Sequence, residues 1–208
     1  ITSYFNEINT VAEVIVKLQD KDGLVFVKPS SRTKYLIDNA ENYKGLTDWA
    51  NVLAELGHTN LAANYELTAK KIRNGILTEL YSEQRQSFAW SLSRISKRFP
   101  NKDRWYPDGV SQLYLVICGV LSPQEPLAVK IWEDFNLKFP GWVAGEKNDQ
   151  FPWGSVAIAS AIMGDQDKAA QFNSWVQDAF VLNQRPYPWY LLESSNSITL
   201  ADLLSPSQ

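Results

Sequence analysis

Carboxylates and aromatic side chains occur together where apolar helical stretches of this chain begin. The acids at these positions are Asp38, Glu41, Asp108 and Glu193. The aromatic residues beside them are Tyr35, Tyr43, Trp105, Tyr106, Trp153, Tyr187, Trp189 and Tyr190. Carboxyl groups donate and accept protons in catalysis, and aromatic faces cover apolar surfaces of ligands. The same acids also suit helix starts, where carboxylates cap N–H groups and meet the positive end of the helix dipole, so both interpretations stay open.

Other catalytic chemistries have little support in the composition. The only histidine, His58, follows Gly57 at a helix end, where a capping or exposed role is expected. A histidine-rich metal site is thereby excluded, and a Ser-His-Asp triad would need His58 itself as the base. The only cysteine, Cys118, lies in an apolar run and is expected in the core. We therefore expect no metal and no cofactor.

The charge and hydropathy of the chain exclude two classes of partner. The net charge is −3 with no block of like charge, which argues against nucleic acid and against anionic membrane surfaces. No apolar run reaches the roughly 18 residues that a membrane span needs. No signal peptide is visible after Ile1, although a processed chain could have lost one, so the compartment stays open.

Apolar periodicity predicts helices along most of the chain. The helices expected before the first aromatic-proline stretch are 1–20, a helix capped by Asp38 that ends at Leu56, and 60–81. Glu41, three residues after Asp38, would complete a capping box. The short link at Gly57 makes the last two helices an antiparallel hairpin. Residues 87–92 alternate like a strand and are expected to pair with the strand near Val25 in a small flap, with 97–104 as a surface loop.

The second half of the chain alternates between two kinds of helix. Residues 110–121 and 156–163 are apolar on every side, which predicts helices that are buried all round. Residues 126–139 and 165–182 carry one apolar face only, and a last helix starts near Leu191. The tail from Ser205 is expected to fray.

An internal repeat follows from this alternation. Pro107, Pro152 and Pro188 each follow an aromatic residue before an apolar helix, 45 and 36 residues apart. Asp38 marks a fourth copy, with the flap inserted after its hairpin. Repeats of this period indicate a helical array, and fully apolar inner helices favour a closed ring of two layers over an open stack.

The openings of these repeats resemble those of the six-hairpin glycosidase superfamily. The matching stretches are 38–46 (DNAENYKGL), 105–113 (WYPDGVSQL), 151–153 (FPW) and 187–190 (YPWY). The resemblance runs from about Tyr35 onwards and is nearest to glycoside hydrolase family 8 and its relatives. It implies an all-α fold, an (α/α)6 toroid formed by one domain over residues 1–208.

The resemblance also implies a function and a set of site residues. In such toroids the loops that enter the inner helices line the sugar site, so the aromatic residues named above become sugar platforms, joined by Glu193. Asp108 and Asp38 become the acidic pair, with Glu41 orienting them, since glycoside cleavage needs one protonated and one ionised carboxyl. The expected activity is hydrolysis of glycosidic bonds in an oligo- or polysaccharide.

The length of the chain leaves a second interpretation open. Six hairpins of roughly 45 residues would need about 270 residues, so this chain corresponds to a toroid without its N-terminal hairpins. A catalytic carboxylate would then lie outside it, or self-association would complete the ring. The alternative function is a non-catalytic binding or structural protein that keeps the fold.

Overall fold

The computed structural model describes residues 2–101, 104–147 and 149–205, which are mainly helical with a small β flap. Two compact units divide the chain. Unit 1 contains Ile1–Pro100 and Cys118–Val120, and unit 2 contains Asn101–Ile117 and Leu121–Gln208. Within the described ranges, no helix is long and apolar enough to cross a membrane. The expectation of a single toroid domain stays a prediction.

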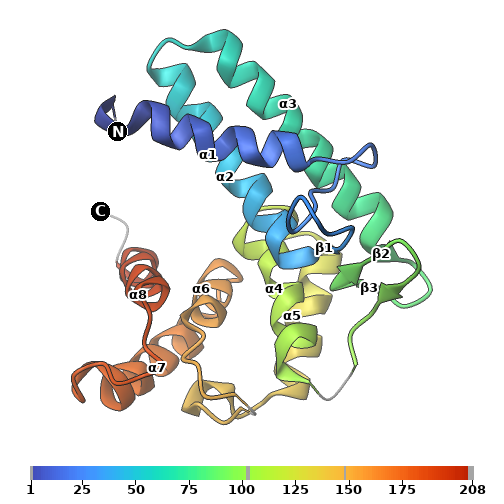
Figure 1. Ribbon diagram of the computed structural model, residues 1–208. Helices are drawn as coiled ribbons and strands as arrows, with labels where there is room; N and C mark the ends of the chain where they lie inside the picture. The colour runs from blue at the N-terminus through green and yellow to red at the C-terminus, as the bar shows by residue number, and fades with distance from the viewer. Residues whose placement is uncertain (1, 102–103, 148, 206–208) are drawn as a thin grey trace. The chain divides into compact units, whose positions relative to one another are not determined.

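Unit 1 is built on the helical hairpin that the sequence predicts. The hairpin pairs α2 (Leu36–Glu55) with α3 (Thr59–Gly75), and α3 continues into the π-helical turn η2 (Ile76–Leu80). The two helices lie side by side in Figure 1 and contact each other along their apolar faces. Helix α1 (Phe5–Leu18), preceded by the short 3-10 helix η1 (Thr2–Tyr4), packs on α2.

The predicted cap of α2 is wrong. Tyr35, with an extended backbone, is the N-cap, and Asp38 lies inside the first turn without a side-chain cap bond at the helix start. The helix begins earlier because Leu36 is fully buried and its N–H bonds to the Trp90 carbonyl, so tertiary contacts start the helix. Glu41 therefore completes no capping box.

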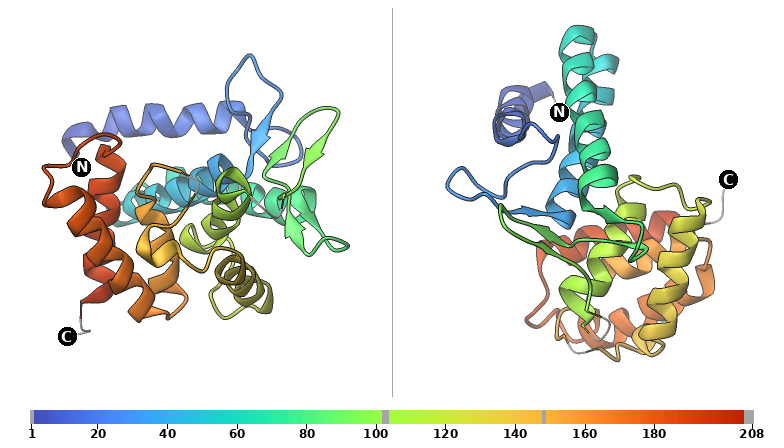
Figure 2. Two further views of the ribbon diagram at one scale, coloured as in Figure 1. Left: turned by 90° about the horizontal axis from the view of Figure 1, so that it is seen from below. Right: turned by 90° about the vertical axis from the view of Figure 1, so that its right-hand side faces the viewer.

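The flap consists of two small antiparallel sheets. The first has the order β1 (Lys34–Tyr35), β4 (Ser91–Leu92), β5 (Lys97–Arg98), and the second pairs β2 (Tyr81–Ser82) with β3 (Ser87–Phe88) (Figure 2). The predicted partner of residues 87–92 is wrong, since Val25 makes only an isolated bridge to Gln19. The predicted loop 97–104 likewise begins as a strand. Two residues of that loop, 102 and 103, lie outside the described residues.

Unit 2 contains the two fully buried helices that the sequence predicts. Every residue of α4 from Val110 to Val116 is buried, as is every residue of α6 (Gly154–Ile162) except the last. Helix α4 (Val110–Ile117) ends four residues before the predicted Leu121, because Gly119 adopts a left-handed backbone with φ of +71°. A proline at its first position starts α5 (Pro126–Lys138), as expected.

Helix α6 is the centre of unit 2. It contacts α4, α8 (Leu191–Leu204) and α7 (Gln166–Val176), which continues into the π-helical turn η5 (Gln177–Val181). The short 3-10 helix η4 (Trp142–Ala144) packs on α7. The three helices with aromatic-proline openings, α4, α6 and α8, are thus neighbours through α6.

Candidate functional site

The aromatic openings of α4, α6 and α8 meet in one continuous series of ring contacts within unit 2. We call this series the aromatic row, and in spatial order it comprises Tyr106, Trp153, Phe151, Tyr190 and Tyr187. Successive ring centroids are 5.0, 6.5, 5.5 and 6.1 Å apart. The tyrosines at positions 106, 190 and 187 expose 49%, 47% and 71% of their surface. The row therefore combines rings from three separate repeats and offers aromatic surface to solvent.

Backbone conformation at the openings places these rings. Tyr106 is extended at φ −121° and ψ 139°, as the residue before a proline prefers, and it interrupts the segment η3 (Trp105–Gly109) ahead of α4. Trp153, the N-cap of α6, has a left-handed backbone with φ of +59°, which is uncommon for a residue other than glycine. Tyr190, the N-cap of α8, is extended. The Tyr106–Pro107 and Tyr187–Pro188 bonds are both cis.

Two of the predicted sugar platforms lie apart from the row. Trp105 is only 2% exposed, and its ring contacts Phe135 and Phe139 in the core. Trp189 is half-buried against Phe180, and its indole N–H donates to Ser194 Oγ at 2.9 Å.

A charged cluster lies beside the aromatic row in unit 2. Glu193, 7% exposed, accepts the Gly154 N–H on Oε2 at 2.9 Å, which ties the start of α8 to the start of α6. Burial lowers the pKa of Lys147, and the nearby carboxylates Asp149 and Glu193 oppose that shift. The Lys147 ammonium lies 4.6 Å from the Trp175 ring centre. The sequence did not reveal Lys147, because it lies in a loop without apolar periodicity.

Asp108 is held in an ion pair at the start of α4. Its side chain is fully buried, and Arg104 donates from Nε to Oδ2 at 2.9 Å and from a terminal nitrogen to Oδ1 at 3.1 Å. The Asn101 N–H donates to Oδ2 at 2.8 Å. The bonds to Asp108 raise the pKa of Arg104, whose side chain is 51% exposed. Both carboxylate oxygens of Asp108 are thus occupied by its own loop.

Asp38 and Glu41 form an electrostatically coupled pair in the first turns of α2 in unit 1. They are three residues apart, which places both on one side of the helix. Desolvation raises the pKa of Asp38, and desolvation together with the charge of Asp38 raises the pKa of Glu41. Glu41 is solvent-accessible while Asp38 is half-buried. A raised pKa makes a carboxyl better suited to donate a proton than an ordinary one.

The two remaining predicted platforms also belong to unit 1. Tyr35 stacks on Trp90 with ring centres 6.5 Å apart and planes 5° from parallel. Tyr43 is half-buried on α2, and its carbonyl accepts the Thr47 hydroxyl at 2.8 Å. The predicted site residues therefore form two groups, the carboxyl pair with Tyr35 and Tyr43 in unit 1 and the aromatic row with its charged cluster in unit 2.

Cys118 is expected to be unreactive in the folded protein. It is 5% exposed, and desolvation raises the pKa of its thiol to about 12, from an ordinary value of 9.0. At neutral pH the nucleophilic thiolate is thus far scarcer than in a free cysteine. Ellman's reagent should modify it at least about 100-fold more slowly in native protein than in guanidinium chloride. Equal rates in both solutions would contradict this placement.

Among the described residues, no group of three or more His, Cys, Asp or Glu side chains could hold a metal ion. His58 is exposed at the start of α3, and its ring lies 4.8 Å from that of Phe5.

Comparison with known proteins finds a likeness of fold to a solved structure. The sequence matches no family model and no curated protein. The structure is similar to that of a GH78 family rhamnosidase of Bacillus sp. GL1, with a TM-score of 0.57 and 12% sequence identity. The match covers 85% of this chain but only 18% of the rhamnosidase, so this chain spans about a fifth of that enzyme's length. At such low identity the similarity concerns the fold alone.

Proposed function

We propose two properties for this protein: the aromatic row of unit 2 binds an oligo- or polysaccharide, and the carboxyl pair of unit 1 hydrolyses glycosidic bonds by carboxyl acid–base catalysis. The aromatic row is the observation that supports this function most directly. Sugar rings have apolar faces that stack on aromatic side chains, and the tyrosine hydroxyls add hydrogen-bonding atoms. A row of rings from three repeats suits a ligand made of several linked sugar units better than a compact one.

The fold comparison supports the same class of activity. The rhamnosidase is a glycoside hydrolase with a fold related to α/α toroids. We propose that this chain also forms part of a toroid, and the nearer likeness to family 8 belongs to this proposal. We also propose that copies of the chain associate to complete the ring.

The carboxyl pair supplies the acid–base chemistry in this proposal. Glu41, whose pKa is raised both by desolvation and by the charge of Asp38, is the proton donor. Asp38 is the ionised partner, acting as base or nucleophile. Asp108, assigned to the acidic pair from the sequence, now has a different proposed role, because Arg104 and Asn101 occupy both of its oxygens. It fixes the loop that carries Tyr106.

Removal of ring surface from the aromatic row is expected to weaken carbohydrate binding. Tyr106→Ala and Tyr187→Ala should each raise the dissociation constant for a bound oligosaccharide by about 3- to 10-fold, since one aromatic contact is worth about 0.5–1.5 kcal/mol. A glycan array identifies the ligand, and titration calorimetry with wild type and variants measures the change. Tyr4→Ala is the matched control, because Tyr4 is 66% exposed on unit 1, outside the row.

Three outcomes separate the possibilities. Loss of affinity in both row variants, with the Tyr4→Ala variant unchanged, supports the row as the binding surface. Unchanged affinity in both row variants would remove the row from carbohydrate recognition. Absence of binding to every glycan on the array would contradict the proposed function itself.

A non-catalytic carbohydrate-binding protein is the second candidate. The occupied carboxylate of Asp108 favours it, because one of the acids that the superfamily resemblance points to serves as an ion-pair partner. Under this alternative, glycans bind to the row with no hydrolysis by the wild type.

A further inference from the structure

Unit 1 contains a cavity, formed by the loop that precedes β1, the turn between β4 and β5, and the turn η2 that follows α3. Its volume is about 460 Å³, within the range of small-molecule sites. Nine residues line it, namely Asp20, Asp22, Phe26, Arg32, Lys34, Glu79, Leu92, Ser93 and Arg94. None of them belongs to the carboxyl pair or to the aromatic row.

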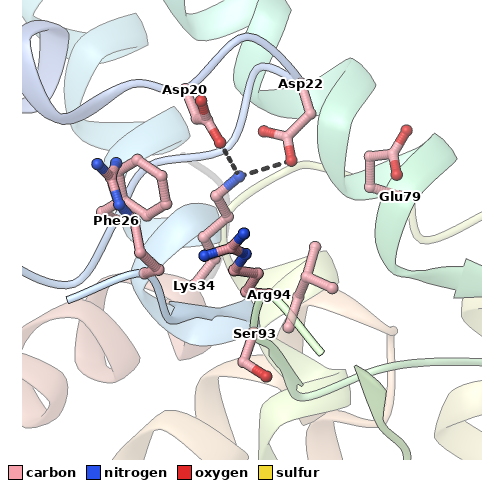
Figure 3. A pocket seen from close by; sticks show the side chains of 9 residues that line it. Asp20, Asp22, Phe26, Lys34, Glu79, Ser93 and Arg94 are labelled. Atoms are coloured by element: carbon pink, nitrogen blue, oxygen red, sulfur yellow. Dashed lines mark hydrogen bonds and ion pairs between the residues drawn. The ribbon is translucent and has the colours of Figure 1, made fainter. Parts of the chain in front are cut away.

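A buried ammonium forms the inner part of this cavity. Lys34 is 4% exposed, and its Nζ donates to Asp20 Oδ2 at 2.7 Å and to Asp22 Oδ2 at 2.6 Å. Figure 3 shows the two carboxylates converging on this one nitrogen. The Phe26 ring lies 4.7 Å from the same nitrogen and 4.9 Å from the Arg32 guanidinium carbon. Two acids share one base, so the group as a whole is negative.

The backbone holds both aspartates in place. Asp20 Oδ1 accepts the Lys21 N–H at 2.9 Å, and Asp22 Oδ1 accepts the Leu24 N–H at 3.0 Å. Gly23 between them has φ of +86°, and an added Cβ would lie 2.2 Å from the Lys71 carbonyl oxygen of α3. This close approach fixes the loop against the helix, so the inner wall of the cavity is preorganised for binding.

The rest of the wall carries charges of both signs. Within the ranges that the structure describes, no ion pair joins Glu79, Arg94 or Arg32 to another side chain. Glu79 comes from η2, Arg94 from the turn after β4, and Arg32 from the loop before β1. Simple anions would face three carboxylates in this cavity, and simple cations would face three basic side chains.

We propose that this cavity binds a small zwitterion, specifically a free α-amino acid. Its ammonium group lies toward Glu79 and the shared carboxylates of Asp20 and Asp22, and its carboxylate lies toward Arg94 and Arg32. Charge-assisted hydrogen bonds of this kind are about twice as strong as neutral ones, and they satisfy both ends of the ligand only when it carries both charges. Leu92 and Phe26 offer apolar contact to its side chain.

Titration of the full chain with the standard amino acids, one at a time, tests this proposal. We expect at least one of them to bind saturably with a dissociation constant below about 1 mM. The analogue without the ammonium and the analogue without the carboxylate should each bind at least about tenfold more weakly. Saturable binding by none of them, or equal binding of the single-charge analogues, would overturn the proposal. So would preferential binding of glycerol or glucose.

Two variants locate the site. Glu79→Gln and Arg94→Gln should each reduce the affinity for the best amino acid at least about tenfold. The matched control is Glu83→Gln, which changes an exposed acid outside the cavity lining. Circular dichroism shows whether each variant is folded. Unchanged affinity in both folded variants would place the ligand elsewhere. The Asp38→Asn variant should keep the affinity, so this result is independent of the proposed hydrolysis.

Discussion

Replacement of Glu41 by Gln is expected to lower the rate of glycosidic-bond hydrolysis by about 100-fold or more. Loss of a positioned general acid typically costs that much, and the amide has no proton to give to the leaving oxygen. Initial rates of reducing-end release from a panel of oligo- and polysaccharides measure the effect. Glu55→Gln, which changes an exposed acid near the end of the same helix, is the matched control and should keep the full rate.

The pH profile identifies the role of Glu41. Its pKa in the folded protein is raised above the ordinary 4.5, so a reaction that needs its protonated form loses rate as pH rises through the raised value. The Glu41→Gln variant should lack this alkaline decline. A variant that hydrolyses as fast as wild type, or that shows an unchanged alkaline decline, would exclude Glu41 as the proton donor.

The same pKa shift has a consequence for stability that distinguishes loss of catalysis from loss of fold. A carboxyl whose pKa is raised on folding binds its proton more tightly in the folded state, so folding stability falls as pH rises through the window above 4.5. Glu41→Gln removes this cost at neutral pH. The variant should therefore unfold at the same temperature as wild type or higher, while its hydrolysis fails.

Lys34→Met is expected to destabilise the protein by about 2–4 kcal/mol. Removal of one partner from a buried ion pair leaves its counter-charges uncompensated, which costs about 3–5 kcal/mol when all groups are fully buried. The cost is smaller here because the side chains of Asp20 and Asp22 are 33% and 23% exposed and can partly hydrate. Urea unfolding followed by circular dichroism measures the difference in the free energy of unfolding.

A matched control and a pH series test whether the loss of stability comes from the ion pairs of Lys34. Lys44→Met removes the exposed pair with Asp48, and such pairs contribute about 0–1 kcal/mol. The hydrogen bond from Lys34 lowers the folded pKa of Asp20 below 3.8. The stability that it contributes is present above pH 3.8 and is lost as pH falls through the folded pKa, so the variant and the wild type should converge in acid. Equal destabilisation by Lys34→Met and Lys44→Met would contradict the stabilising role of the ion pairs that Lys34 makes with Asp20 and Asp22.

Helix periodicity predicted much of the fold because burial follows it closely. Residues 110–116 and 154–161 are buried on every side, as expected for helices with apolar residues all round. The prediction failed where contacts distant in sequence decide the local structure. The Leu36 N–H donates to the Trp90 carbonyl, and α2 begins at Leu36. Asp38, which suits an N-cap by residue type, therefore lies inside the helix. Likewise, Lys34 and Tyr35 carry no apolar pattern, yet they form the strand that pairs with Ser91 and Leu92.

The sequence predicted which residue types form the candidate site, but not which of these residues contact one another. The aromatic-proline openings indicated Tyr106, Trp153 and Tyr190, and the structure brings these into one row within unit 2. Phe151 completes the row, although no rule of spacing distinguishes it from a core aromatic residue. The ion-paired group of Lys34, Asp20 and Asp22 was missed, because Asp20 to Gly23 resembled an ordinary helix stop and Lys34 lies further along the chain, in β1.

The π-helical ends of two amphipathic helices have a geometric consequence. Helix α3 continues into η2 and helix α7 into η5, and each such turn closes its hydrogen bonds one residue later than an α-helical turn does. One extra residue is thereby absorbed inside each helix instead of in the loop that follows. Because the wider turn takes up that residue, the residues that follow, from Tyr81 and Leu182 onwards, lie one position later in the sequence than in an uninterrupted α-helix. The residue at which the chain leaves each of these helices is therefore set within the helix itself, by the number of residues in its last turn.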